Sequence, residues 1–366
     1  MKFELDRSEL LNAVTIAAKA TAQKGVRPIL ANILIEAEND KIRLVATDME
    51  AMSIIEIPAD VTTCGKITAP AKLLQELLSS LPGDSLFPVE VSADPQKDEI
   101  DFSMGKSKFS IRGLHADDFP PVPSVNTAFA KINGSEFSKA LRQALIAAAL
   151  DDGNATQKSV YLDFTEAMKI VSTDSKRLAI RDASEISLPE ELKKGFILPI
   201  KAANDVAAMF AGSDDAEIAT FKEQLVFKRG NTTYITRLVD GKYISYERVL
   251  PKEHKIIASF YRKELGQALK SLLPIARNNN FMVRFDISDS EIKLSADGRE
   301  NGKAETSIPC KADGAIQIAF NLKYLQDFAG ATDSEEITLK MTTPSYPGLL
   351  SDSEGKLHYI VMPLAY

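Results

Sequence analysis

The sequence predicts an α+β protein of three topologically similar domains, each with two helices packed on antiparallel sheets. The main observation is a short corner that recurs as "ATDMEAMSI", "STDSKRLAI" and "SADGRENGK", with its aspartate at Asp48, Asp174 and Asp297. The copies are spaced by 126 and 123 residues, and this nearly constant interval indicates an internal repeat the size of a domain. An alternating strand pattern precedes each copy, as in "KIRLVATD" and "MKIVSTD". Such alternation indicates strands with one buried face.

The first helix of each repeat is predicted near the start of its domain. The three segments read "SELLNAV" from Ser8, "SEFSKAL" from Ser135 and "RKELGQAL" from Arg262. In the middle segment the apolar residues fall at helical spacing and form one stripe. The polar side chains expected to point away from this stripe are Lys139, Arg142 and Gln143.

The second helix of each repeat carries a lysine, an amide three residues later and then an acid. The segments are "APAKLLQELL", "LPIKAANDVAAMF" and "FNLKYLQDFAGA", with the lysines at Lys72, Lys201 and Lys323. Residues three apart share a helix face, so each lysine is expected on the polar side of its helix. Three matches at one interval indicate a triplicated domain.

Strand-like segments close the repeats, and proline-bearing stretches separate them. The closing segments are "DEIDFSMGKSKFSIRGL", "EQLVFKRGNTTYITRLV" and "GKLHYIVMPL". Residues 120–132 and 250–260 have the proline content of linkers. We therefore expect domains at 1–126, 127–254 and 255–366.

Composition bounds the cellular setting and the class of partner. The chain has 366 residues, 45% hydrophobic and 26% charged, with a formal net charge of −7. Its apolar runs are too short to span a membrane, and the acidic start "MKFELDRSELL" differs from a signal peptide. We expect a cytoplasmic protein without a membrane partner. The negative charge argues against a broad basic face that grips nucleic acid.

The sequence contains no recognisable catalytic or metal-binding motif. Cys64 and Cys310 are far apart and lack CxxC spacing, which excludes the usual zinc and disulfide patterns. "GKS" at 105–107 lacks the first glycine of a phosphate loop. Because the corner aspartate recurs once per domain, we interpret it as a turn residue that accepts local amides. We expect neither an enzyme nor a cofactor or metal.

Eight segments in order resemble the bacterial sliding clamp family, the beta subunit of DNA polymerase III. These segments are "MKFELDRSEL", "RPILANILIEA", "LVATDMEAM", "FSIRGLHADDFPPVP", "STDSKRLAI", "TRLVDGKYISYERVLPKE", "AFNLKYLQD" and "YIVMPL". The resemblance implies the DNA clamp fold: a head-to-tail dimer that forms a ring, with helices lining the hole. Such a ring encircles duplex DNA without sequence specificity and tethers the replicative polymerase without catalysis.

The size of a helix is compatible with a two-chain ring. Helices about 10 Å wide give an opening of only ~9 Å when six line the hole, and ~28 Å when twelve do. A DNA duplex is roughly 20 Å wide. Two chains with six helices each can therefore surround DNA, and one chain cannot.

The resemblance also implies a modest cationic lining of the hole. A topological link needs no strong grip on phosphate, so this lining is compatible with an acidic protein. The residues expected to face DNA are Lys24, Lys72, Lys139, Arg142, Lys201, Lys263, Lys270 and Lys323. Lys24 is included because the family carries a DNA-contacting basic residue at that position.

The family binds short linear peptides of the polymerase and the clamp loader in an apolar pocket between its second and third domains. The matching positions are Val171, Thr173, Ser175, Lys176, Arg177, Leu178, Ile244, Arg248, Val249, Asn321, Tyr324, Ile360, Met362, Pro363 and Leu364. We expect Arg177 and Arg248 to hold a peptide carbonyl or carboxylate. Ile244 stands where the family usually has proline, and the segment "ATQKSVYLDF" is shorter than in the family.

The implied ring closes through sheet edges. Phe109 and Ile111 in "KFSIRGL" are expected to meet Pro274 and Ile275 of a second copy. Two other hypotheses remain open: a repeat-built peptide-binding scaffold that does not encircle DNA, and a hydrolase with unrecognised acids. The lysines on the helix faces favour the clamp over the scaffold, and the absence of a nucleophile–base set disfavours the hydrolase.

Overall fold

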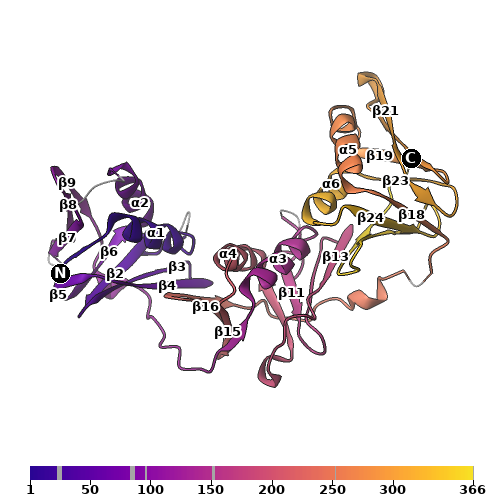
Figure 1. Cartoon of the computed structure of the whole chain (residues 1–366). Helices are drawn as coiled ribbons and strands as arrows, with labels where there is room; N and C mark the ends of the chain where they lie inside the picture. The colour runs from indigo at the N-terminus through magenta and orange to yellow at the C-terminus, as the bar shows by residue number, and fades with distance from the viewer. Residues whose placement is uncertain (23–26, 83–86, 95–96, 151–152, 252, 366) are drawn as a thin grey trace. The chain divides into compact units, whose positions relative to one another are not determined.

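The computed structural model describes residues 1–22, 27–82, 87–94, 97–150, 153–251 and 253–365 (Figure 1). The chain forms two compact units, each made of two stretches. The first unit comprises Met1–Ile132 and Asp214–Arg237, and the second comprises Asn133–Ser213 and Leu238–Tyr366.

The first unit contains two helices and two antiparallel sheets. The helices are α1 (Arg7–Ala18) and α2 (Ala71–Ser80). The strands are β1 (Lys2–Leu5), β2 (Asn32–Glu38), β3 (Lys41–Thr47), β4 (Ala51–Pro58), β5 (Asp60–Thr63), β6 (Gly65–Pro70), β7 (Val89–Asp94), β8 (Glu99–Met104), β9 (Ser107–Arg112), β10 (Ala130–Ile132), β15 (Ala216–Phe221), β16 (Gln224–Arg229) and β17 (Thr232–Arg237). They form a 5-stranded sheet in the order β5-β1-β7-β8-β9 and an 8-stranded sheet in the order β10-β15-β16-β17-β4-β3-β2-β6. Helices α1 and α2 lie side by side against the larger sheet, on β2, β3, β4 and β6 (Figure 1).

The second unit contains four helices and two antiparallel sheets. The helices are α3 (Gly134–Leu145), α4 (Ile200–Phe210), α5 (Arg262–Ala276) and α6 (Leu322–Ala331). The strands are β11 (Ser159–Asp163), β12 (Lys169–Thr173), β13 (Arg177–Asp182), β14 (Gly195–Pro199), β18 (Ile256–Tyr261), β19 (Met282–Ile287), β20 (Glu291–Asp297), β21 (Lys303–Pro309), β22 (Lys311–Ala312), β23 (Ile316–Asn321), β24 (Glu336–Met341), β25 (Gly348–Asp352) and β26 (Leu357–Val361). Their orders are β14-β11-β12-β13-β26-β25-β24-β18-β22 and β21-β20-β19-β23. Helices α3 and α4 pair, as do α5 and α6.

Local sequence explains where the first helix of a repeat begins. Asp6 caps α1 by accepting hydrogen bonds from the backbone N–H groups of Ser8 and Glu9, and Asn133 caps α3 by accepting one from Glu136. Each predicted helix is present, so the α+β class with two helices in each of three similar domains is confirmed. Within the described part of the chain, no helix is both long and apolar enough to cross a membrane.

The sheets continue across the expected domain boundaries. Strand β17 of the middle third pairs with β4 of the first third, with Ile235 opposite Met52. Strand β13 of the middle third pairs with β26 of the last third, with Leu178 opposite Ile360. In each unit, the strand that follows the recurring corner (β4 or β13) therefore begins beside a strand of the next repeat (β17 or β26).

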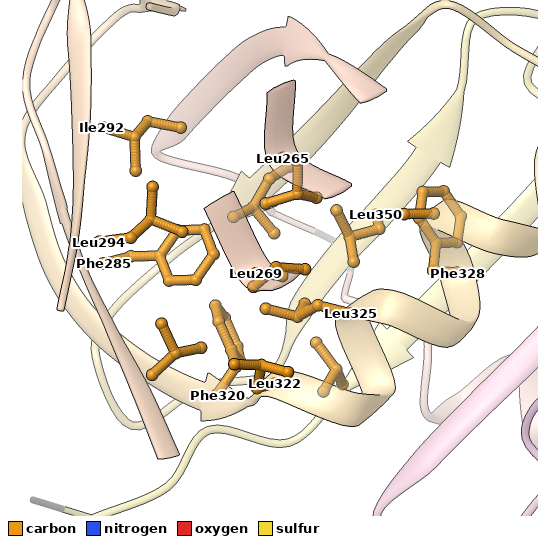
Figure 2. Close-up of a cluster of buried hydrophobic side chains, with 14 of the residues drawn as sticks. Leu265, Leu269, Phe285, Ile292, Leu294, Phe320, Leu322, Leu325, Phe328 and Leu350 are labelled. Carbon is orange, nitrogen blue, oxygen red and sulfur yellow. The ribbon is translucent and has the colours of Figure 1, made fainter. Parts of the chain in front are cut away.

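The last third has a core in which the two helices face the sheets. Figure 2 shows Leu265 and Leu269 of α5 with Leu325 of α6, close to the rings of Phe285 and Phe320. These two rings lie edge to face at a centroid separation of 5.8 Å. The apolar residues are almost completely buried, which makes this core a main source of stability for the second unit.

Each recurring corner is a turn fixed by its aspartate. Asp48 accepts hydrogen bonds from the N–H groups of Glu50 and Ala51 at 3.0 and 2.8 Å. Asp174 accepts the equivalent pair from Lys176 and Arg177 at 2.9 and 3.0 Å. The residue after Asp48 and the residue after Asp174 adopt a positive φ. At the third corner Asp297 accepts one such bond, from the Arg299 N–H, and the positive φ falls on Arg299 instead of Gly298. The interpretation of these aspartates as turn residues is therefore confirmed.

Arg177 joins the second corner to α6. Its guanidinium pairs with Asp174 at 3.0 Å, pairs with Asp327 of α6, and donates a hydrogen bond to the Tyr359 hydroxyl at 3.2 Å. Its charged end also lies 4.2 Å from the centre of the Tyr324 ring. The side chain is only 10% exposed, so these contacts are largely shielded from water.

We expect Arg177→Ala to lower the free energy of unfolding of the second unit by about 2–4 kcal/mol, because it leaves Asp174 and the Tyr359 hydroxyl without their partner. Urea denaturation followed by circular dichroism measures this loss. The exposed neighbour provides a matched control, since Lys176→Ala should stay within about 0.5 kcal/mol of the parent protein. Equal stability of the two variants would contradict this account of Arg177.

Candidate functional site

A cavity of about 250 Å³ opens at the second corner, within the second unit. It lies where β13 begins and β26 ends, so the corner and the C-terminal strand form its walls. Its lining residues are Asn154, Thr156, Gln157, Thr173, Ser175, Lys176, Arg177, Leu178, Tyr243, Ile244, Val249, Ile360 and Met362.

The floor and mouth of this cavity are apolar. Leu178 and Ile360 are buried beneath it, while Ile244, Val249 and Met362 are 45%, 42% and 43% exposed. Large apolar side chains that gather around a concavity while open to solvent are typical of a ligand site. Met362 adds a flexible thioether that adapts to different apolar partners.

Tyr243 lines the cavity, and two further tyrosines pack close to it. The rings of Tyr161 and Tyr243 stack at a centroid separation of 4.9 Å, and the Tyr246 hydroxyl donates a 2.6 Å hydrogen bond to Asp163. Burial raises the pKa of Tyr243 above its ordinary value. Burial also acts to raise the pKa of Asp163, but hydrogen bonds from Tyr246 and Thr165 outweigh it and hold that pKa below its ordinary value. Asp163 is therefore a charged acceptor at neutral pH, which fixes Tyr246.

The polar rim comes from a segment that sequence reasoning did not assign to the pocket. Asn154 accepts hydrogen bonds from the Gln157 N–H at 3.0 Å and from the Thr156 hydroxyl at 2.7 Å. The Gln157 amide in turn donates to the Ser175 hydroxyl of the corner. The signal in the sequence was an Asn with a polar partner three residues later, a common turn pattern that carries no ligand information.

The structure brings together many of the residues expected in the peptide pocket. Those that line the cavity are Thr173, Ser175, Lys176, Arg177, Leu178, Ile244, Val249, Ile360 and Met362. The expected residues outside the lining are Val171, Arg248, Asn321, Tyr324, Pro363 and Leu364. Tyr243 lines the cavity and was missed, because a tyrosine in a loop gives no sign of which surface it will support.

The residues outside the lining have other positions. Val171 is fully buried in the sheet, and Asn321 caps α6 by accepting a hydrogen bond from the Lys323 N–H. Arg248 lines a neighbouring cavity of about 390 Å³ together with Val249 and Tyr346. The backbone N–H of Leu364 donates to Ala319, which holds the end of the chain against β23.

Arg177 lines the cavity and also has partners within the protein. We expected its guanidinium to hold a peptide carbonyl or carboxylate, and the structure pairs it with Asp174 and Asp327. The neighbouring Lys176 is exposed at the same corner. The sequence could not reveal the pairing of Arg177 with Asp327, because Asp327 is distant along the chain.

The lysines of the second helices are exposed, but each has a neighbour. Lys72 and Lys201 lie 4.0 and 3.6 Å from the acids one turn later on their helices, and the Lys323 ammonium lies 3.9 Å from the centre of the Phe281 ring. Lys263 and Lys270 of α5 are also exposed. These residues are accessible to a polyanion.

Of the remaining residues expected to face DNA, Arg142 is exposed and Lys139 is half-buried, and both have a partner within the second unit. Lys139 forms a 2.8 Å ion pair with Asp333, and Arg142 donates a hydrogen bond to the Ala207 carbonyl at 3.2 Å. Gln143, expected to point away from the core, is buried and donates to the Ala331 carbonyl. Lys24 lies outside the described residues.

The residues expected at a dimer interface lie at or near sheet edges. Strand β9, which carries Phe109 and Ile111, is the edge of its sheet, and β21 is the edge of the 4-stranded sheet. Phe109 is half-buried, whereas Ile111 is only 6% exposed and packs into the core of its own unit. On α5, Pro274 is exposed and Ile275 is half-buried. On β9, Phe109 is therefore accessible to a partner chain and the buried Ile111 is not.

No metal site emerges from the residues that the structure describes, since none of their His, Cys, Asp and Glu side chains form a group of three that could hold an ion. The free thiol of Cys64 is exposed, and burial raises the pKa of Cys310.

Three family descriptions match successive parts of the chain. The N-terminal domain of the DNA polymerase III beta subunit matches residues 1–123, the central domain matches 131–244, and the C-terminal domain matches 247–365. These three matches follow the triplication seen in the elements.

Relatives and solved structures agree over the whole length. The beta sliding clamp of Synechococcus elongatus is 28% identical, over 100% of this chain and 99% of the relative, and that of Pseudomonas putida is 26% identical over 100% of both. The sliding clamp of Pseudomonas aeruginosa bound to griselimycin superposes with a TM-score of 0.92 at 25% identity, covering 100% of both chains. The beta subunit from Thermotoga maritima has the same fold, with a TM-score of 0.91 at 24% identity and coverage of 100% of this chain and 99% of the other. The chain therefore belongs to the DNA polymerase III beta subunit family, the sliding clamps.

Proposed function

We propose that this sliding clamp closes around duplex DNA as a head-to-tail homodimer and tethers the replicative polymerase through a peptide held at the second corner. Processivity of DNA polymerase III is the function that family membership assigns to it. The observation that carries the tether is the 250 Å³ cavity with Ile244, Val249 and Met362 open to solvent at its mouth. The clamp loader would use the same cavity, since both partners present short linear peptides.

The proposed DNA-facing surface consists of basic residues of the helices, Lys139 and Arg142 of α3 among them. Lys72, Lys201 and Lys323 recur at one position of the three second helices, and Lys263 and Lys270 add two charges on α5. Contacts of this kind act on the phosphate backbone and read no sequence. A clamp that slides needs such weak, uniform contacts.

Ring closure is proposed at the free edges of the two smaller sheets. Strand β9 of one copy would pair with β21 of a second copy, which would bury two otherwise unpaired edges. Phe109, Pro274 and Ile275 would supply apolar contacts beside this pairing. The proposed domains within each copy are 1–126, 127–254 and 255–366.

The protein is proposed to act in the cytoplasm without catalysis of its own. Polymerase activity would belong to the tethered partner, and the clamp would contribute only a topological link. A peptide-binding scaffold that does not encircle DNA is not favoured, because the family is that of the sliding clamps.

The topological link has a direct test. Once loaded, the protein should remain on nicked circular DNA through gel filtration and should run off after a restriction enzyme linearises that DNA. The reason is that a closed ring leaves DNA only at an end. Equal retention on circular and linear molecules would contradict encirclement, and a solution mass of one chain would contradict the dimer.

The peptide cavity is tested by removing apolar contacts at its mouth. Val249→Ala with Met362→Ala should weaken binding of the polymerase C-terminal peptide by about tenfold or more, because about 1.4 kcal/mol of lost apolar contact corresponds to that factor. Fluorescence anisotropy of the labelled peptide measures the affinity.

Ile257→Ala is the matched control, since Ile257 is also an exposed apolar residue of the second unit but lies outside the cavity. Its peptide affinity should equal that of the parent protein. The cavity is misassigned if both variants bind the peptide equally well.

A further inference from the structure

The first unit contains a second cavity at its own corner. It has a volume of about 300 Å³ and lies beside the start of β4 and the end of β17. Its lining residues are Thr47, Met49, Glu50, Ala51, Met52, Pro120, Pro121, Pro123, Lys222, Gln224, Ile235 and Arg237.

The two cavities are built from equivalent corners. In the second unit the Thr173 hydroxyl donates to the carbonyl of Arg177 at 2.6 Å, and in the first unit the Thr47 hydroxyl donates to the carbonyl of Ala51 at 2.7 Å. Each threonine oxygen also accepts the N–H of the left-handed residue two positions later. The backbone that shapes both cavities is therefore the same.

The neighbouring strands are equivalent as well. Strand β17 pairs with β4 as β26 pairs with β13. Beyond these pairings, the Arg237 N–H donates to the Glu50 carbonyl at 2.9 Å, and the Met362 N–H donates to the Lys176 carbonyl at 2.9 Å. Arg237 thus stands where Met362 stands in the first-described cavity. Ile235 likewise corresponds to Ile360.

The interior of the second cavity is apolar. Met52 and Ile235 form a buried floor, and Met49 lies 42% exposed at the mouth, where its equivalent at the other corner is Ser175. Pro120, Pro121 and Pro123 supply a rigid wall of this cavity. Two thioethers beside prolines give a surface that suits varied apolar side chains.

The rim of the second cavity has a surplus of positive charge. Lys222 is exposed, and the Arg237 side chain is 58% exposed. The lining also contains an acid, Glu50, whose carboxylate lies 3.9 Å from the Arg237 guanidinium. Both side chains are exposed, so this ion pair contributes little free energy in water. An apolar floor beneath two cations complements a ligand that carries apolar side chains and a carboxylate.

We propose that this cavity is a second peptide site, which binds a short extended segment with apolar side chains and an acidic group. This inference rests on the proposed function, because the ligand class is taken from the equivalent cavity at the second corner. The second site binds more weakly, because its lining has one exposed large hydrophobic side chain, Met49, whereas the other cavity has Ile244, Val249 and Met362. A clamp would then hold two segments of one partner, or two partners, on a single chain.

The methionines allow each site to be observed separately. Met49 and Met52 report on the proposed site and Met362 on the cavity at the second corner, among nine methionines in the chain. The protein is labelled with ¹³C at the methionine methyl groups and titrated with the ten C-terminal residues of the replicative polymerase. A scrambled peptide of the same composition is the control for specificity.

We expect saturable shifts of Met362 first, followed by shifts of Met49 and Met52 at a peptide concentration about tenfold higher, equivalent to about 1.4 kcal/mol. Lys222→Glu with Arg237→Glu should abolish the Met49 and Met52 shifts and leave Met362 unchanged. Lys19→Glu with Lys97→Glu, a double charge reversal in the same unit but outside the cavity, should change neither.

Val249→Glu distinguishes a second site from transmission of binding at the first. It should remove the Met362 shift and leave those of Met49 and Met52. The second site would be overturned if the peptide shifted the Met362 signal but not those of Met49 and Met52, or if the Met49 and Met52 shifts disappeared in Val249→Glu. A silent Met362 beside responsive Met49 and Met52 would instead overturn the proposed cavity at the second corner and support this one, and silence of all three would overturn both.

Discussion

The hydrogen bonds that backbone N–H groups donate to an aspartate carboxylate, across a residue with positive φ, constrain much of this structure. At the second corner Asp174 fixes Ser175 in the left-handed region and thereby sets the pairing of β12 with β13. A slip of one residue would turn Leu178 from the cavity to the opposite face of the sheet. The pairing of β13 with β26, and so the shape of the cavity, depends on this one turn.

The same constraint has been combined with different side chains in each repeat. The second corner adds Arg177, whose ion pair with Asp327 joins the corner to α6. The first corner has Ala51 at the position of Arg177, so the residue there has no guanidinium that could form an ion pair with a helix. The third corner has Ala296 where the others have threonine, and there Asp297 accepts a hydrogen bond from the Arg299 N–H and pairs with Lys303 at 3.3 Å. The first two corners share their backbone, whereas the third has a negative φ at Gly298 and continues into a 3-10 helix. Single substitutions determine what each corner contacts.

Local features were predictable from the sequence, whereas long-range pairings were not. The helices, the alternating strands and the corner turns depend on neighbours within a few residues, and the structure has them where the patterns predicted. Gln143 shows the limit: its helix position is polar, but it is buried because Arg181 donates to it and Ala331 accepts from it. The same holds for Tyr243 in the cavity. Their roles depend on residues brought together only by the fold.

The charge arrangement fits a protein that must hold DNA without gripping it. On α2 and α4 the lysine proposed to face DNA has an acid one turn later, Glu76 or Asp205, at 4.0 or 3.6 Å. Each acid lowers the local positive potential, and binding to phosphate must compete with it. Because affinity for DNA rises steeply with the number of neutralised phosphates, partly compensated lysines keep each contact weak. In the proposed ring, retention would come from closure around the duplex, and the weak contacts would leave the ring able to move along it.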